Sequence, residues 1–269
     1  MDEIMESVAR AQRIVIKIGT SSLTYETGRM NLRRIDRLAM VLSDLMNQGK
    51  EIILVSSGAI GIGVNKMGLE EKPKDTRGKQ AAAAVGQCEL MYLYDKAFSG
   101  YSHTVAQILI TRDDIAIPRR KRNMQNTFSY LIDKGIIPVV NENDTISVEE
   151  IEIGDNDSLS ARVAELVDAD LLILLSDIDG LYDHDPHRYK EAKIIDRVYS
   201  VDDVRHLAGG AVSKVGTGGM VTKLDAAEIA TKAGINMVIM NGNDIDSIPS
   251  LLEGESVGTL FAANNYVEL

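Results

Sequence analysis

The chain has 269 residues, a formal net charge of −11 at pH 7 and 45% hydrophobic residues. This length fits one large α/β domain or two small ones, and the hydrophobic content is enough to bury a sizeable core. The acidic balance excludes a surface built to bind nucleic acid or an anionic membrane, because both need a basic face. An anionic ligand would therefore have to be held by a local positive site.

The cysteine content and the N-terminal sequence point to a cytoplasmic protein. Cys88 is the only cysteine, so no intrachain disulfide is possible, which favours a reducing compartment. The acidic N-terminus lacks the apolar region of a signal peptide. No apolar run approaches the ~18 residues that span a bilayer. Cys88 lies in a helix-like run beside alanines, and we interpret it as a core residue rather than a nucleophile.

Short runs rich in β-branched residues alternate with amphipathic ones along the chain. They predict buried strands at 14–16, 52–55, 105–110, 136–140, 171–175 and 237–240. Helical spacing predicts helices at 32–46, 77–98, 123–134, 158–167 and 218–233, the first capped by Asn31. This alternation predicts a mostly parallel sheet with helices on both faces. In such sheets the ligand site lies outside the carboxyl ends of the strands.

The first two predicted strands end in residues suited to an anion. Lys17 lies in a buried apolar run, where a lysine is costly unless it meets an anion, and Gly19 follows it. We favour an anion site there over a lysine that snorkels to solvent. After the second strand, Ser57 and Gly58 begin a helix whose N–H groups are available to a ligand; close helix–sheet packing is the alternative explanation.

A glycine-rich segment, 216–223, precedes the last long helix. Its glycines let the backbone approach a ligand, the helix presents N–H groups and the positive end of its dipole, and Lys223 adds a charge. This combination suits a polyphosphate. No Walker A sequence occurs in the chain, and a plain connection is the alternative.

Polar clusters follow the fourth and fifth predicted strands. The segments 141–145 and 154–158, separated by an expected hairpin, favour recognition of an ammonium or amide; as the alternative they are turns, with Asp157 or Ser158 capping a helix. Asp177, at the tip of the fifth strand, is placed to touch a ribose or a metal-bound phosphate. His184 and His187 have a spacing that suits a metal, but no third ligand is evident, so we interpret their segment as a solvated loop.

In this order, over roughly 13–262, the motifs resemble those of the glutamate 5-kinases in the amino-acid-kinase family. The short segments that begin at Lys17 and at Ser57 are shared across the wider family. The blocks 79–87, 141–144 and 216–223 together are specific to the glutamate kinases, and they are accompanied by 154–157, 180–186 and 258–261.

The resemblance implies a role for each matching residue. Lys17, Lys223 and Asp157 would be catalytic, with Asp157 orienting the two lysines. Glutamate would be held by Ser57, Gly58, Asp144 and Asn156. ATP would be held by Lys17, Gly19, Ser176, Asp177, Thr217, Gly218, Gly219, Met220, Val221, Thr222 and Lys223. No residue is expected to ligate a metal directly, because Mg²⁺ dehydrates reluctantly and would be bound through ATP oxygens and water.

The implied reaction converts ATP and L-glutamate to ADP and L-γ-glutamyl phosphate, the first step of proline biosynthesis. The carboxylate nucleophile is already ionised at neutral pH, so no general base is needed. The resemblance also implies a homo-oligomer that is coupled to an NADPH-dependent glutamyl-phosphate reductase. Two alternatives remain: a family kinase acting on aspartate, acetylglutamate, carbamate, UMP or isopentenyl phosphate, or an inactive sensor of amino acids or nucleotides.

The implied architecture is one three-layer α/β/α domain over 1–269, with a mainly parallel sheet of about eight strands. Many bacterial relatives continue into a PUA domain, whereas this chain stops at Leu269, so we expect none. Glu149, Glu150 and Glu152 would repel an anionic substrate, and we expect them to face solvent.

Overall fold

The computed structural model describes residues 2–25, 27–147, 156–186, 188–208 and 219–264. Within these ranges one sheet has the strand order β3-β4-β2-β1-β5-β7-β8-β6. All neighbouring strands are parallel except β7 and β8. The strands are β1 (Arg13–Ile18), β2 (Glu51–Ser56), β3 (Val105–Ile110), β4 (Ile137–Glu142), β5 (Leu171–Ser176), β6 (Arg197–Val198), β7 (Asn236–Asn241) and β8 (Thr259–Phe261).

All six predicted strands are confirmed, and so is the mainly parallel, eight-stranded sheet. The sequence did not predict β6 and β8, which have two and three residues. Runs this short carry no readable alternation of apolar and polar residues, so they form strands only because a neighbouring strand is already in place.

The predicted helices are confirmed with shifted ends. The helices are α1 (Glu3–Arg10), α2 (Thr20–Leu23), α3 (Leu32–Asn47), α4 (Ala59–Lys66), α5 (Thr76–Ser99), α6 (Arg112–Ala116), α7 (Pro118–Asp133), α9 (Asn156–Leu166), α10 (Val201–Val204), α11 (Met220–Lys232), α12 (Ser247–Leu252) and the 3₁₀ turn η1 (Arg205–Ala208). Asn31 caps α3 as predicted, accepting a hydrogen bond from the N–H of Arg34 at 3.2 Å. The helix α7 begins five residues before its predicted start, at Pro118, where a proline needs no N–H donor.

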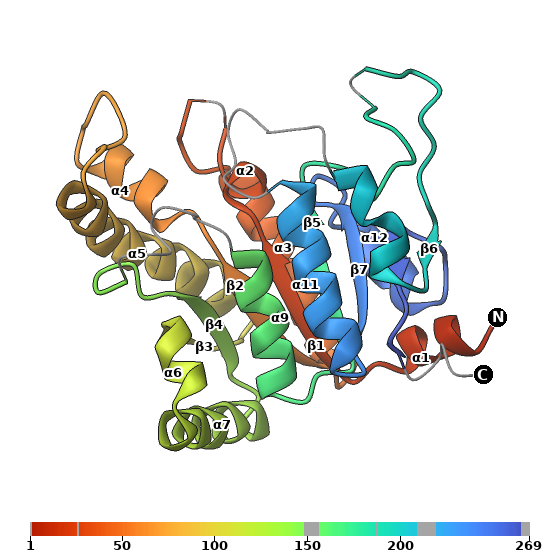
Figure 1. Ribbon diagram of the computed structural model, residues 1–269. Helices are drawn as coiled ribbons and strands as arrows, with labels where there is room; N and C mark the ends of the chain where they lie inside the picture. Colours follow the sequence, from red (N-terminus) through yellow and green to blue (C-terminus); the bar gives the residue numbers. More distant parts are fainter. Residues whose placement is uncertain (1, 26, 148–155, 187, 209–218, 265–269) are drawn as a thin grey trace.

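The helices cover both faces of the sheet, which confirms the three-layer architecture (Figure 1). Side chains alternate between the faces of a strand, so Ile14 and Ile16 of β1 pack in the core shared with α1, α3, α5 and α12. Val15 packs in the other core, shared with α7, α9 and α11. Lys17 has the parity of Val15, and its side chain is therefore directed toward the layer of α9 and α11.

Cys88 is exposed on α5, so its interpretation as a core residue is wrong. The buried face of α5 runs through Gln87, Leu90 and Tyr94, which recur at helical spacing. Cys88 lies one residue beyond Gln87, about 100° further around the helix. None of the helices within the described ranges is long and apolar enough to cross a bilayer.

Two glycines let α4 and α5 pack with their backbones in direct contact. A Cβ atom on Gly63 of α4 would overlap the carbonyl oxygen of Ala82 in α5, and one on Gly86 of α5 would overlap the carbonyl oxygen of Ala59 in α4. Both obstacles are backbone atoms, which cannot rotate away. This contact fixes α5 relative to the loop that follows β2.

We predict that Gly63→Ala destabilises the protein by about 1–3 kcal/mol, because the methyl group must push α4 away from α5. The matched control in the same helix is Gly61→Ala, whose nearest neighbour would be Cγ2 of Thr20 at 3.9 Å. Gly61→Ala should be neutral or stabilising by up to about 1 kcal/mol, since alanine favours helix. Urea unfolding of the three proteins measures both values. Equal stabilities would contradict the tight packing.

Candidate active site

A buried cluster of two lysines and one aspartate lies at the carboxyl ends of the central strands. Lys17, near the end of β1, is 7% exposed, and its Nζ lies 2.6 Å from Oδ1 of Asp157 in the first turn of α9. Lys223, in the first turn of α11, is 6% exposed, and its Nζ lies 3.1 Å from Oδ2 of Asp157. Lys17 is thus inside the molecule and ion-paired, and the alternative of a snorkelling surface lysine is wrong.

The cluster combines two cations with one anion in a buried position. Burial by itself raises the pKa of the Asp157 carboxyl, but the charges of Lys17 and Lys223 outweigh it and hold that pKa well below its usual range. Asp157 is therefore ionised throughout the neutral pH range. The cluster keeps a surplus of positive charge beside the N-terminus of α11, which adds the positive end of a helix dipole.

Asp157 is not a helix cap, because α9 begins at Asn156 and places Asp157 and Ser158 within its first turn. A carboxylate in that turn interacts favourably with the helix dipole. The hydroxyl of Thr222 lies 3.0 Å from Oδ2 of Asp157 and 2.8 Å from the carbonyl oxygen of Gly219. The first turns of α9 and α11 are thereby joined through one carboxylate.

The loops after β1 and β2 lie against each other beside this cluster. Gly19 precedes α2 and Gly58 precedes α4, where Gly58 has a φ of 99° that favours glycine. A Cβ atom on Gly58 would lie 3.1 Å from Cγ2 of Thr20. The hydroxyls of Thr20 and Ser57 are 3.3 Å apart, and the Ser57 hydroxyl donates to the carbonyl oxygen of Ile18. Gly58 therefore packs closely against Thr20 and begins α4, while a role of the N–H groups of α4 in ligand binding stays a prediction.

At the ends of β2 and β4, Asn156 is 7% exposed and held by two hydrogen bonds. Its Nδ2 donates to the carbonyl oxygen of Ser56 at 2.6 Å and to Oδ1 of Asn141 at 2.7 Å. Asp144 lies half-buried in the turn after β4. The structure therefore brings Ser57, Asn156 and Asp144 to one edge of the sheet.

At the end of β5, Ser176 is buried and Asp177 is exposed. The Ser176 hydroxyl donates to Oδ1 of Asp177 at 3.2 Å. Because β5 pairs with β1, these two residues flank the lysine cluster on the side opposite to β2. The helix α11 begins with Met220 and the half-exposed Val221, which lie in the same first turn as Lys223.

Two predicted site residues, Thr217 and Gly218, lie outside the described residues. His187 and the acidic run with its expected hairpin, which were expected to be solvated, also lie outside them: Glu149, Glu150 and Glu152. His184 lies 3.3 Å from the Asp183 carboxylate and packs its ring against Tyr189. Within the ranges that the structure describes, no three His, Cys, Asp or Glu side chains are grouped in a way that could hold a metal ion.

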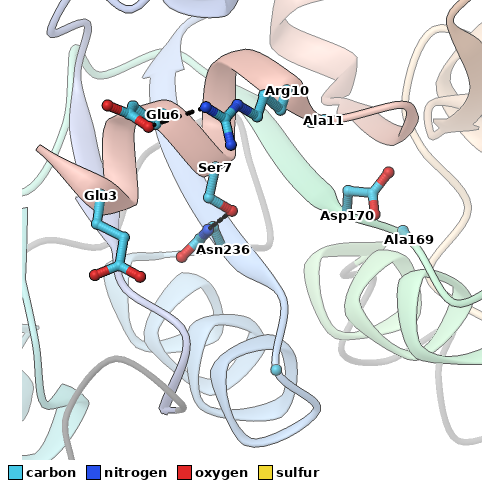
Figure 2. Close-up of a pocket in the computed structure, with 9 residues that line it drawn as sticks. Glu3, Glu6, Ser7, Arg10, Ala11, Ala169, Asp170 and Asn236 are labelled. Atoms are coloured by element: carbon cyan, nitrogen blue, oxygen red, sulfur yellow. Dashed lines mark hydrogen bonds and ion pairs between the residues drawn. The ribbon is translucent and has the colours of Figure 1, made fainter. Parts of the chain in front are cut away.

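A separate cavity of about 420 Å³ lies at the amino ends of β5 and β7, against α1 (Figure 2). Asp170 and Asn236 line it from the sheet, and Glu6 and Arg10 of α1 pair at its rim. The amino ends of parallel strands form the edge opposite to the carboxyl ends. This cavity is therefore not part of the lysine cluster.

Two residues of the site belong to segments predicted from the sequence but were given no role of their own there. The Thr20 hydroxyl contacts the Ser57 hydroxyl, and the Thr20 side chain fills the space that a Cβ atom on Gly58 would approach. Asn141 accepts a hydrogen bond from Nδ2 of Asn156. From the residues alone, the signal for Asn141 was its place in the polar cluster 141–145 that follows a buried apolar strand. Such residues are more often turn formers, so this signal alone does not identify a ligand site.

Comparisons with known proteins agree with this geometry. Residues 12–241 match the family model described as "Amino acid kinase family". The chain is 55% identical to a glutamate 5-kinase of Clostridium perfringens, over 94% of this chain and 96% of that protein. It is 56% identical to a glutamate 5-kinase of Clostridium acetobutylicum, over 96% of this chain and 97% of that protein.

Among solved structures, the UMP kinase of Bacillus anthracis superposes with a TM-score of 0.67 over 94% of this chain and 97% of that one, at 18% identity. This likeness supports the fold alone. From the family model and the two relatives together, we conclude that the chain belongs to the amino acid kinase family.

We predict that Asp157→Asn costs about 3–5 kcal/mol of stability at pH 7, because two buried ammonium groups lose their shared counter-ion. The folded pKa of Asp157 is depressed, so its contribution is present above the unfolded pKa of about 3.9 and is lost as pH falls below it. Urea unfolding of the wild type and of Asp157→Asn from pH 7 to pH 2 measures the difference in their free energies of unfolding. This difference should narrow below about pH 4.

The matched control is Asp225→Asn, which removes a half-exposed carboxylate paired with the half-exposed Arg205. An exposed ion pair is worth about 0–1 kcal/mol, so this variant should unfold almost as the wild type does. A difference between wild type and Asp157→Asn that stays constant down to pH 2 would contradict the assigned ionisation.

Proposed function

We propose that the protein transfers the γ-phosphoryl group of ATP to the side-chain carboxylate of L-glutamate, giving ADP and L-γ-glutamyl phosphate, the first step of proline biosynthesis. The observation that carries the proposal is the buried cluster of Lys17, Asp157 and Lys223 at the carboxyl edge of the sheet. It occurs in a chain that shares more than half of its residues with glutamate 5-kinases.

The two lysines address the main difficulty of the reaction, which is electrostatic. A carboxylate must approach a polyphosphate, and charge spreads over the oxygens of the transferring group. Lys17 and Lys223 are buried and held in place by Asp157, so they present positive charge that needs no reorganisation. The glutamate carboxylate is ionised at neutral pH, and the site needs no general base.

The acceptor is proposed to bind between the ends of β2 and β4. Asp144 pairs with the α-ammonium group, Asn156 accepts a hydrogen bond from the same group, and Ser57 and Gly58 hold the rest of the amino acid. Holding the carboxylate in line with the phosphoryl group converts a bimolecular step into a unimolecular one, which supplies much of the acceleration. The half-buried position of Asp144 and the buried position of Asn156 support this placement.

The nucleotide is proposed to lie over the ends of β1 and β5 and the start of α11. Gly19, Ser176, Asp177 and the segment from Thr217 to Lys223 hold it. The N-terminus of α11 suits phosphate groups because its N–H groups are unpaired within the helix. No side chain of the described residues is assigned to Mg²⁺ itself; the ion would enter with ATP and would supply positive charge against the phosphates. The donor set of the site, two ammonium groups and backbone N–H groups, fits phosphate oxygens rather than the metal itself.

Two alternatives are less favoured. Family kinases with other acceptors share the fold, but the chain is only 18% identical to the UMP kinase of Bacillus anthracis. An inactive sensor has no need for two buried lysines around one carboxylate, since a pair of buried charges is costly to maintain.

We also propose a single domain over 1–269, a homo-oligomer, a cytoplasmic location, and coupling to a glutamyl-phosphate reductase that consumes the labile acyl phosphate.

The proposal predicts glutamate-dependent release of ADP by the purified protein, with hydroxylamine trapping the acyl phosphate as a hydroxamate. Aspartate, acetylglutamate, carbamate, UMP and isopentenyl phosphate serve as competing acceptors. We expect turnover with L-glutamate to exceed that with each of the others. Preference for another acceptor would replace the proposed substrate, and absence of turnover with all of them would favour the sensor.

We further predict that Lys17→Ala and Lys223→Ala each lower kcat about 10²–10³-fold, as expected when one contact to a developing charge is lost. Lys232→Ala is the control on the same helix as Lys223, because Lys232 is exposed and pairs only on the surface with Glu228. That variant should keep wild-type turnover. Circular dichroism and calorimetric binding of glutamate establish that the variants are folded. Wild-type kcat in either cluster variant would remove that lysine from the phosphoryl site.

A further inference from the structure

A chain of buried side-chain amides crosses the carboxyl edge of the sheet between β2 and β4. Asn156 of α9 donates from Nδ2 to Oδ1 of Asn141, and Asn141 donates from Nδ2 to Oε1 of Gln87 in α5 at 2.8 Å. All three side chains are less than 10% exposed. The chain therefore links the helical layer of α5 to the helical layer of α9.

Two backbone groups determine which atom of each amide donates and which accepts, because a backbone N–H can only donate and a backbone carbonyl oxygen can only accept. We call this order of donors and acceptors the direction of the chain. The N–H of Glu142 must donate, and it donates to Oδ1 of Asn141 at 2.9 Å. The carbonyl oxygen of Ser56 must accept, and it accepts from Nδ2 of Asn156 at 2.6 Å. With both ends fixed, the Nδ2 group of Asn141 has to point at Gln87, and an oxygen acceptor must stand there.

This direction decides what Asn156 can offer to a ligand. Both hydrogens of its amide group are already donated, one to Ser56 and one to Asn141. The group left for a ligand is the carbonyl oxygen Oδ1, which can only accept a hydrogen bond. An acceptor of this kind recognises an ammonium group and repels a carboxylate.

Gln87 meets this requirement at an energetic cost. Its Oε1 serves Asn141, while its Nε2 is buried and has no hydrogen-bond partner in the part of the chain that the structure describes. An unpaired buried donor is unfavourable. The helix cannot shift to relieve it, because the neighbouring Gly86 packs against the backbone of α4. A methionine would fill the same space without an unpaired donor, so the acceptor oxygen is what distinguishes glutamine here.

We propose that Gln87 is a positioning residue of the acceptor site: through Asn141 it fixes the amide of Asn156 with its carbonyl oxygen toward the substrate, so that the site selects an acceptor with a free α-ammonium group. Gln87 itself does not touch the substrate. This inference rests on the proposed function, because it assumes that Asn156 contacts the amino acid.

The test compares Gln87→Met, which removes the acceptor oxygen at similar volume, with Gln87→Glu, which keeps an oxygen facing Asn141. We expect Gln87→Met to raise KM for glutamate about tenfold or more, as follows from leaving the Asn141 donor unpaired. KM for ATP should stay within twofold. Glutarate lacks the ammonium group, so its KM should differ little between wild type and Gln87→Met. For Gln87→Glu, the KM for glutamate should lie within about threefold of the wild-type value.

Tyr94→Phe is the matched control. It removes the other polar contact of the same helix face, between the Tyr94 and Ser56 hydroxyls at 2.8 Å, and leaves the amide chain intact. Its KM for glutamate should match that of the wild type. The proposal is overturned if Gln87→Met keeps its KM for glutamate, if both KM values rise together, if Gln87→Glu behaves as Gln87→Met does, or if Tyr94→Phe has the same effect.

A measurement on the wild-type protein covers the case in which Gln87→Met does not fold. The two side-chain amide hydrogens of Asn156 and the one that Asn141 donates to Gln87 are donated within the core, so they should exchange with solvent far more slowly than those of exposed asparagines in the NMR spectrum. Rapid exchange at Asn156 would overturn the proposed direction of the chain. Wild-type turnover with glutamate is measured first, so that failure of the proposed function is distinguished from failure of the amide chain.

Discussion

The arrangement of the site depends on one carboxylate shared by two buried ammonium groups. Lys17 comes from a central strand and Lys223 from a helix more than 200 residues later, and Asp157 holds both. Neither lysine could remain charged in this position alone, because burial without a counter-ion is costly. The pairing therefore requires α9 and α11 to lie side by side over β1, as they do (Figure 1).

The first turn of α9 connects the two halves of the proposed reaction. Asp157 pairs with the two lysines that are proposed to face the phosphates, and the preceding Asn156 is fixed by the amide chain at the proposed acceptor side. Adjacent residues of a helix turn cannot move independently. Any shift of α9 would therefore disturb both the lysine cluster and the amide chain, and in the proposed reaction this would keep the two reactants in one relative geometry.

The site also resolves the conflict between an acidic protein and anionic substrates. The chain carries a formal charge of −11, which repels anions at long range. At short range, the burial of Lys17 and Lys223 lowers the local dielectric, which would strengthen their attraction for an anion bound at the proposed site. A local excess of one positive charge in a buried position therefore outweighs many exposed negative charges that salt and water screen.

The sequence by itself determined the six long strands, the main helices and the strand ends that carry Lys17, Gly58 and Asp177, because periodicity and glycine placement are local properties. It did not reveal β6 and β8, the exposure of Cys88, or the direction of the amide chain from Gln87. Each of these depends on which distant segment lies opposite: a partner strand, the neighbouring helix, or a backbone N–H of fixed polarity. Only the tertiary structure brings those partners together, so only it could decide them.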